Sequence, residues 1–283
     1  MGHKNNMIYD ETIATLNGMR AFGTSKHMDK AQNETKDKIY SYSTFRTYKD
    51  KCCDFVTYAR KEHKCYTLQQ AQVYVGEFLK KKIDDGCSPW TIKLYANALG
   101  KLYQVPSNSF IDLPSRSRHD ITRSRNDATR DRHFSTKNNA PLIEFCKHVG
   151  LRRSELENIK GKDLFLENGQ YYIHVENGKG GKSRNVPILD NNPLVIEKMT
   201  YTLPNERVWG KVHSGCDVHS YRSEYANSLY NKLARPLDTL SRSEKYYCRK
   251  DMAGRIFDKE AMHEVSKALG HERICVIAYS YLR

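Results

Sequence analysis

The sequence has none of the long apolar runs that a membrane protein needs. No segment approaches the about 18 apolar residues of a transmembrane helix, and hydrophobic residues make up only 39% of the chain. The first sixteen residues, MGHKNNMIYDETIATL, also lack the apolar core of a secretory signal. We therefore expect a cytoplasmic protein, nucleoid-associated if it is bacterial, with no membrane partner.

Paired cysteines are also missing. The eight cysteines are scattered along the chain, and no two form a CxxC pair. In a chain without a secretory signal they are read as reduced thiols. Cys52, Cys53, His63 and Cys65 lie close in sequence, but their spacing matches no common zinc finger. We expect half-buried helix cysteines there, and hence no metal.

Acidic residues are too few to balance the basic ones. There are 33 Asp and Glu against 47 Lys and Arg, which leaves a formal net charge of +14. Such an excess points to a polyanion, and nucleic acid is the first candidate because neutralising phosphates needs many Lys and Arg side chains. Composition alone leaves a second interpretation open, in which the charge serves only solubility. The 19 tyrosines and 9 phenylalanines indicate a folded chain.

The length of 283 residues favours two domains, at about 150 residues each. Residues 1–104 predict a small all-helical domain with 17 basic and 11 acidic side chains. Apolar residues recur at helical spacing from about Thr44. A second helix is expected to begin after Thr67 and to end at Gly86, and a third begins at Pro89.

Residues 105–134 read as a basic linker, because prolines and serines interrupt any regular pattern. Six arginines in this segment suit a chain that lies along a phosphate backbone. Four aspartates dilute that charge, so a solvated linker is equally compatible with the sequence. The arginines are Arg116, Arg118, Arg123, Arg125, Arg130 and Arg132.

The remaining residues, 135–283, predict a domain that is mainly α with one small antiparallel sheet. Helical patterns alternate with two short β-like runs, LFLENGQYYIHV and RNVPIL, the first with a turn at Glu-Asn-Gly. Between these runs lies a glycine-rich loop, GKGGKSR. The loop lacks the first glycine of a nucleotide P-loop and leads into a strand, so ATP binding is disfavoured.

Four local features of this domain could carry chemistry. Arg152 follows a helix-ending glycine at the start of the next helix, where phosphate is readily bound. The glycine-rich loop presents Lys179 at a hairpin. His219 and Arg222 share a helix face at i and i+3. His271 follows the helix-ending Gly270, with tyrosines shortly beyond it. Each feature alone is also compatible with a structural or surface role.

In this order, however, the features resemble the catalytic series of the tyrosine recombinases, the phage-integrase family. The matching motifs are, in chain order, GLRxxEL, GKGxKxR-VPI, HxxR, LGH and a terminal Tyr. They lie within about residues 135–283. The helical region before it resembles the core-binding domain of that family in general pattern only. Within the family, the chain is most similar to integrases of mobile or conjugative elements.

The resemblance implies a two-domain, C-shaped DNA clamp that cleaves and rejoins DNA through a 3′-phosphotyrosyl intermediate, with no cofactor. It assigns phosphate binding to Arg152 and Arg222, the general acid to Lys179, and phosphate contacts and proton transfer to His219 and His271. Glu155 is expected to support Arg152, and Arg153 to point elsewhere. Implied partners are double-stranded DNA recombination sites, three further copies in a homotetramer, and accessory or directionality factors.

Three departures from the family pattern bear on this assignment. The stretch before His271 carries an insertion at about residues 231–257, where Arg249 imitates the second arginine without its histidine. The nucleophile is assigned to Tyr281, with Tyr279 as the alternative, because Ser280 stands nine residues after His271. Only Leu282 and Arg283 follow Tyr281, so we expect the tetramer to be held without a C-terminal tail.

Two alternative functions remain open at this point. One is a DNA-relaxing enzyme similar to type IB topoisomerases, which would use the same set of residues. The other is a catalytically silent DNA-binding relative, which the complete motif set disfavours.

Overall fold

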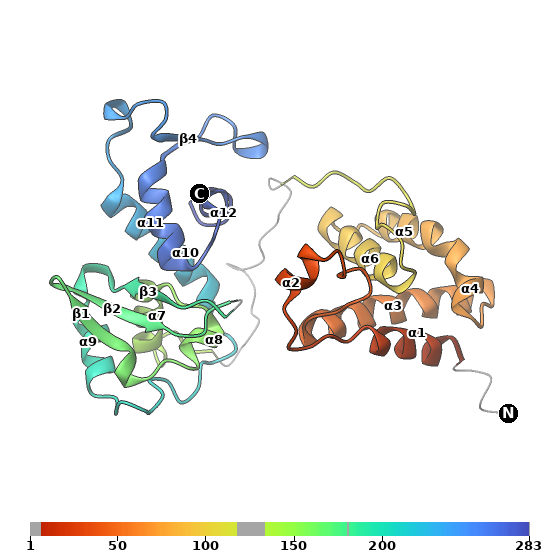
Figure 1. Ribbon diagram of the computed structural model, residues 1–283, viewed down its shortest axis with the longest axis horizontal. Coiled ribbons are helices and arrows are strands. Elements are labelled where there is room, and N and C mark those ends of the chain that lie inside the picture. The colour runs from red at the N-terminus through yellow and green to blue at the C-terminus, as the bar shows by residue number, and fades with distance from the viewer. Residues whose placement is uncertain (1–6, 118–133, 180, 283) are drawn as a thin grey trace. The chain divides into compact units, whose positions relative to one another are not determined.

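The structure is a computed structural model that describes residues 7–117, 134–179 and 181–282. The chain divides into two compact units, residues 1–120 and 121–283. Figure 1 shows that helices predominate in both. The expected linker, residues 105–134, contains the point of division, but its residues 118–133 lie outside the described part of the chain.

The described residues of the first unit form helices packed around α3. Helix α3 begins after Ser41, whose hydroxyl accepts a hydrogen bond from the Thr44 backbone N–H, and ends at Lys64 in the left-handed conformation. Its buried face packs against α1 and α6. The helices are α1 (Met7–Gly18), α2 (Lys26–Ala31), α3 (Tyr42–His63), α4 (Leu68–Ala71), α5 (Val75–Asp84) and α6 (Pro89–Leu102).

The sequence predicts the starts of α4 and α6 correctly. Thr67 caps α4 in a capping box with Gln70, and Pro89 is the first residue of α6. The single helix expected after Thr67 is wrong, because a 3₁₀ turn at Gln72–Tyr74 separates α4 from α5. A 3₁₀ turn preserves the i, i+3 spacing of apolar residues, so periodicity does not detect it.

The cysteine-rich segment of this unit is part of the hydrophobic core. Cys52 and Cys65 are buried there. His63 stacks on the ring of Tyr74, with centroids 3.7 Å apart, and its Nε2 lies 3.0 Å from the Glu77 carboxylate. Within the described ranges, no group of three or more metal-binding side chains is found here or elsewhere.

The second unit combines helices with a three-stranded antiparallel sheet. Strand β1 (Leu164–Glu167) pairs with β2 (Gln170–Val175), which pairs with β3 (Arg184–Pro187), in the order β1-β2-β3. The β1–β2 turn is made by Asn168 and Gly169, both with positive φ, as the Glu-Asn-Gly text predicts. The helices are α7 (Ala140–Val149), α8 (Arg153–Leu156), α9 (Pro193–Thr200), α10 (Val218–Leu233), α11 (Lys259–Leu269) and α12 (Ile274–Ser280).

The prediction of one small sheet is wrong, because the described chain contains a second. Strands β4 (Lys245–Tyr247) and β5 (Ile256–Asp258) form an antiparallel pair inside the expected insertion at residues 231–257. Three-residue strands are too short to show an alternating pattern. Arg235 secures the pair by donating two hydrogen bonds to the buried Asp258 carboxylate, at 2.8 and 2.9 Å.

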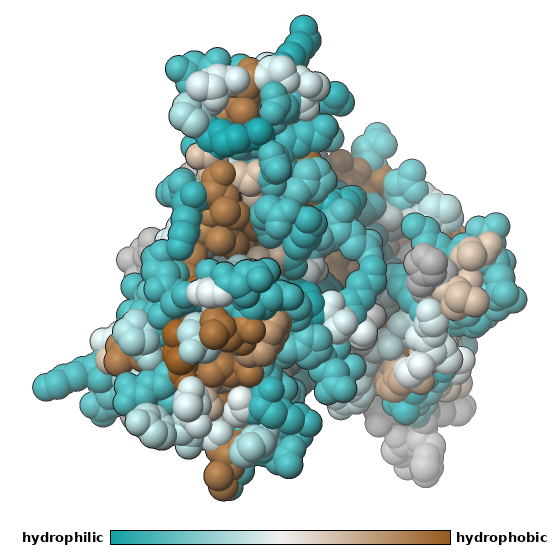
Figure 2. Space-filling model, turned by 60° about the vertical axis from the view of Figure 1, so that its left-hand side comes forward, coloured by the Kyte–Doolittle hydropathy of each residue, from teal (hydrophilic) through white to brown (hydrophobic). Residues whose placement is uncertain are grey.

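Of the described helices, none has the length and apolar character to cross a bilayer. Figure 2 shows hydrophilic residues over most of the face in view, with separate hydrophobic patches between them. Isolated exposed apolar residues are normal on a folded protein.

Candidate active site

The first site arginine is positioned by the end of α7. Gly150 ends this helix with φ +52, and a Cβ at that position would lie 2.2 Å from Cδ1 of Tyr225. Only glycine fits both the conformation and the space. The sharp turn buries Leu151 and puts Arg152 at the cap of α8, with its Nη1 2.8 Å from Oε1 of Glu155.

The second site arginine, Arg222, lies on α10 and is only 1% exposed. Its Nη1 donates to the Gly150 carbonyl and its Nη2 to the Leu269 carbonyl. Its Nε donates to the hydroxyl of Tyr281 at 3.2 Å. Burial lowers the pKa of Arg222, but a guanidinium in a protein stays protonated. Fixed carbonyl partners therefore hold a buried cation against the tyrosine hydroxyl.

Tyr281 is 5% exposed and lies just after α12. Nε2 of His271 is 3.1 Å from its hydroxyl, and the ring of His219 meets its ring edge-on at 5.7 Å between centroids. Because Arg222 can only donate, the tyrosine oxygen accepts there and its own proton can be directed at His271. Two of the predicted residues, Arg222 and His271, thus meet at the Tyr281 hydroxyl, and a third, His219, packs against the tyrosine ring.

The pKa of His271 is lowered to about 4. Burial is the largest cause, followed by the positive charges of Arg222, Arg152, Lys179 and Arg184. The imidazole is consequently neutral at pH 7 and can accept a proton. Lys179, one of the charges that lower this pKa, is exposed on the β2–β3 loop.

Tyr279, the alternative nucleophile, is engaged elsewhere. Its hydroxyl donates to the carbonyl of Arg249 at 2.7 Å and accepts from the Arg249 backbone N–H at 2.9 Å. Residues two apart on a helix do not share a face. The structure therefore brings Tyr281, and not Tyr279, to Arg222.

Arg153, next to Arg152, faces a different part of the unit. Its guanidinium donates to the carbonyls of Val212, His213, Ser214 and Cys216, at 2.6 to 3.2 Å. This loop leads directly into α10. Arg153 thus supports the start of the helix that carries His219 and Arg222.

The site contains one residue that the sequence analysis did not single out, Arg184 at the start of β3. Its Nη1 and Nη2 donate to the two oxygens of Glu155, at 2.9 and 2.7 Å. Its Nε donates to the Ala268 carbonyl at 2.9 Å. The arginine of GKGxKxR was part of the motif, but its partners are 29 and 84 residues away and no local pattern identifies them.

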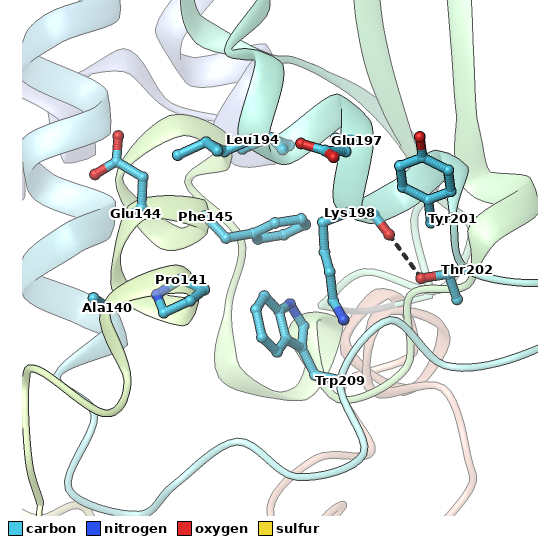
Figure 3. A pocket seen from close by; sticks show the side chains of 11 residues that line it. Ala140, Pro141, Glu144, Phe145, Leu194, Glu197, Lys198, Tyr201, Thr202 and Trp209 are labelled. Atoms are coloured by element: carbon cyan, nitrogen blue, oxygen red, sulfur yellow. Dashed lines mark hydrogen bonds between the residues drawn. The ribbon is translucent and has the colours of Figure 1, made fainter.

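An apolar pocket of about 600 Å³ lies between α7 and α9. Figure 3 shows Phe145 and Trp209 among its lining, with Lys198 beside them. Nζ of Lys198 is 5.2 Å from the centroid of the Trp209 ring. None of the predicted catalytic residues lines this pocket, so it is separate from the site built around Tyr281.

Comparison with known proteins agrees with this fold. Over 92% of this chain and 81% of the other, it superposes with a TM-score of 0.53 and 19% identity on XerH site-specific recombinase bound to palindromic difH substrate, in a post-cleavage complex. A pre-cleavage complex of XerH with difH substrate gives a TM-score of 0.51 and 18% identity, over 99% and 93% of the two chains. No curated protein sequence matches the chain.

The fold and the site define a class, the tyrosine recombinases, which are enzymes that cleave and rejoin DNA strands. Residues 119–283 match the model of the phage integrase family. Because this match covers more than half of the sequence, the chain belongs to the phage integrase family.

Proposed function

We propose that this chain is a site-specific recombinase of a mobile element, which integrates or excises DNA through a 3′-phosphotyrosyl intermediate at Tyr281. The observation that carries the proposal is the position of the Tyr281 hydroxyl, within 3.2 Å of Arg222 and 3.1 Å of His271. A nucleophile needs a neighbouring base and a cation for the charge that develops on attack.

The cleavage step follows from these positions. The Tyr281 oxygen attacks the scissile phosphorus and loses its proton towards His271. Arg152 and Arg222 bind the non-bridging oxygens, where negative charge grows in the transition state. The phosphate itself is negative and offsets the arginine charges around His271, which raises the affinity of the imidazole for the proton. His219, whose ring packs on Tyr281, completes the phosphate contacts.

Lys179 is assigned as the general acid. The bond between phosphorus and the 5′-oxygen breaks, and the ammonium protonates that oxygen as it leaves. Attack by the 5′-hydroxyl of a second strand then reverses the step and releases Tyr281. The phosphotyrosyl bond retains the energy of the phosphodiester, so the exchange itself needs no nucleotide hydrolysis.

The DNA partner is proposed to be a pair of double-stranded recombination sites. Both units carry an excess of basic residues, and the first unit has no part of the catalytic series. We assign it backbone contacts that hold the duplex, so that the two units act as a C-shaped clamp with the basic segment at residues 105–134 between them. A homotetramer assembled on DNA, with accessory or directionality factors, completes the proposal for a cytoplasmic enzyme.

The experiment uses a nicked suicide substrate, on which cleavage traps the enzyme covalently on DNA. Wild type and Tyr279→Phe are expected to form the adduct, whereas Tyr281→Phe forms none. An adduct with Tyr281→Phe but none with Tyr279→Phe would transfer the role to Tyr279. Absence of any wild-type adduct on recombination-site DNA would contradict enzymatic function altogether.

A second arm separates recombination from simple relaxation. A supercoiled plasmid without a recombination site should stay supercoiled, while two site-bearing duplexes should yield a recombinant product. Relaxation of every plasmid without strand exchange would indicate a topoisomerase-like enzyme instead.

A further inference from the structure

The cleavage scheme gives Arg184 no role, yet this residue is built into the site. The Glu155 side chain is 2% exposed, and each of its two carboxylate oxygens accepts two hydrogen bonds. Oε1 accepts from Nη1 of Arg152 and Nη1 of Arg184, at 2.8 and 2.9 Å. Oε2 accepts from the Arg152 backbone N–H and Nη2 of Arg184, at 2.8 and 2.7 Å. Arg152 is thus held by a carboxylate that Arg184 holds in turn.

Glu155 depends on this pairing to remain charged. Burial alone would raise the pKa of its carboxyl, but the hydrogen bonds and charge of Arg184, with those of Arg152, lower it to about 2. Removing one partner from a buried charge leaves the other charge uncompensated. Without Arg184, the Glu155 carboxylate would have Arg152 as its remaining guanidinium partner and would draw that guanidinium away from the phosphate.

Arg184 also contacts the end of α11. Its Nε donates to the Ala268 carbonyl, while Nη2 of Arg152 donates to the carbonyls of Leu269 and Gly270, at 3.1 and 3.4 Å. The last carbonyls of a helix have no partner within the helix and carry partial negative charge. The two guanidiniums therefore bind neighbouring carbonyls at the same helix end, one residue before His271.

Two glycines leave the space that Arg184 occupies. A Cβ at Gly178 would lie 2.9 Å from its Nη1, and a Cβ at Gly270 would lie 3.0 Å from its Cδ. Gly178 directly precedes Lys179, and Gly270 directly precedes His271. The Arg184 side chain, 8% exposed, is accordingly packed between the segments that present the general acid and the histidine.

From these contacts we propose that Arg184 is a positioning residue for DNA cleavage. It holds Glu155 in place, and through Glu155 it holds the Arg152 guanidinium against the end of α11. Its side chain also packs against Gly178 and Gly270, the residues that precede Lys179 and His271. The inference rests on the proposed function, because a positioning role requires a reaction at this site.

The experiment measures single-turnover cleavage of a suicide substrate at saturating DNA, together with the Kd for DNA and the Tm. Arg184→Met is expected to lower the cleavage rate by about 100-fold, which is the cost of misplacing a reacting group by about 1 Å, with little change in Kd. Arg184→Lys keeps the charge but not the two-pronged contact, and should recover part of the rate. In an Arg152→Ala background, replacing Arg184 should lower the cleavage rate little further, because both changes act through the Arg152 guanidinium.

The matched control is Arg235→Met, which removes another arginine–carboxylate pair of the same unit, with Asp258, outside the site. Its Tm should fall, because the buried Asp258 loses these hydrogen bonds, but its cleavage rate at saturating DNA should stay at the wild-type level. Equal losses of cleavage rate in Arg184→Met and Arg235→Met would show that Arg184 has only a general structural role. If the losses of cleavage rate from Arg184→Met and Arg152→Ala were additive in the double variant, the inference would also be overturned. If wild type forms no adduct, the proposed function fails first and this inference fails with it.

Discussion

The two units carry their positive charge in different ways. In the first, cations lie over aromatic rings, with Nζ of Lys51 4.4 Å from the Tyr95 centroid and Cζ of Arg20 4.4 Å from that of Phe45. The second unit also has such a contact, between Lys198 and Trp209. In addition it encloses two arginine side chains, Arg222 and Arg184, which are fixed by backbone carbonyls or a carboxylate. A buried guanidinium is costly to desolvate and needs fixed partners. This difference agrees with the proposal that Arg222 binds the reacting phosphate and that cations of the first unit contact the DNA backbone.

The largest effect should come from the buried arginine of the second unit. Arg222→Lys keeps the charge but loses the geometry that reaches two carbonyls and Tyr281 together. We expect single-turnover cleavage to fall by about 10²- to 10³-fold, while the Kd for DNA changes little. Arg235→Lys, outside the site, is the control. Wild-type cleavage by Arg222→Lys would remove the distinction between buried and surface cations.

A smaller effect, on stability, should follow from the turn that positions Arg152. Gly150→Ala adds a Cβ against Tyr225 at a left-handed position, and it should destabilise the second unit by about 2 to 5 kcal/mol. Gly210→Ala, with nothing within 4 Å of the added Cβ and no positive φ, should be nearly neutral. Chemical denaturation followed by fluorescence checks both. A neutral Gly150→Ala would show that the α7 turn is not tightly packed.

The smallest effect should come from the first unit. Lys51→Gln removes a cation that lies over Tyr95. If this lysine contacts the DNA backbone, affinity should fall and the slope of log K against log salt should decrease by about 0.9. The cleavage rate at saturating DNA should not change. A rate loss at saturation comparable to that of Arg222→Lys would contradict the division of roles between the two units.

The sequence predicts short-range features of this protein well and long-range ones poorly. Thr67, Pro89 and Gly150 mark helix ends by local chemistry, and the Asn168-Gly169 turn defines the β1–β2 hairpin; all four occur as expected. Helix α1 is not evident from the sequence, because the polar Thr12 stands between Ile8 and Leu16 in its buried i, i+4 stripe.

The same distinction applies to the site. A motif order along the chain suggested six residues: Arg152, Lys179, His219, Arg222, His271 and Tyr281. The structure places His219, Arg222 and His271 against Tyr281, and Arg152 on the Leu269 carbonyl that Arg222 also binds. Lys179 lies on the β2–β3 loop, and the catalytic roles of all six stay predictions. Choosing between Tyr279 and Tyr281 required the fold, because the difference lies in contacts to Arg249 on one side and Arg222 on the other. Arg184 likewise acquires its partners only when β3, α8 and α11 pack together.

The central claim is that Tyr281 forms the covalent bond to DNA. After suicide-substrate cleavage and digestion with trypsin, residues 274–283 form one peptide, ICVIAYSYLR, that contains both tyrosines. Fragmentation of this peptide by mass spectrometry, with a nucleotide remnant attached, assigns the modified residue directly. The account predicts the remnant on Tyr281. A remnant on Tyr279, or on any residue outside this peptide, would contradict it.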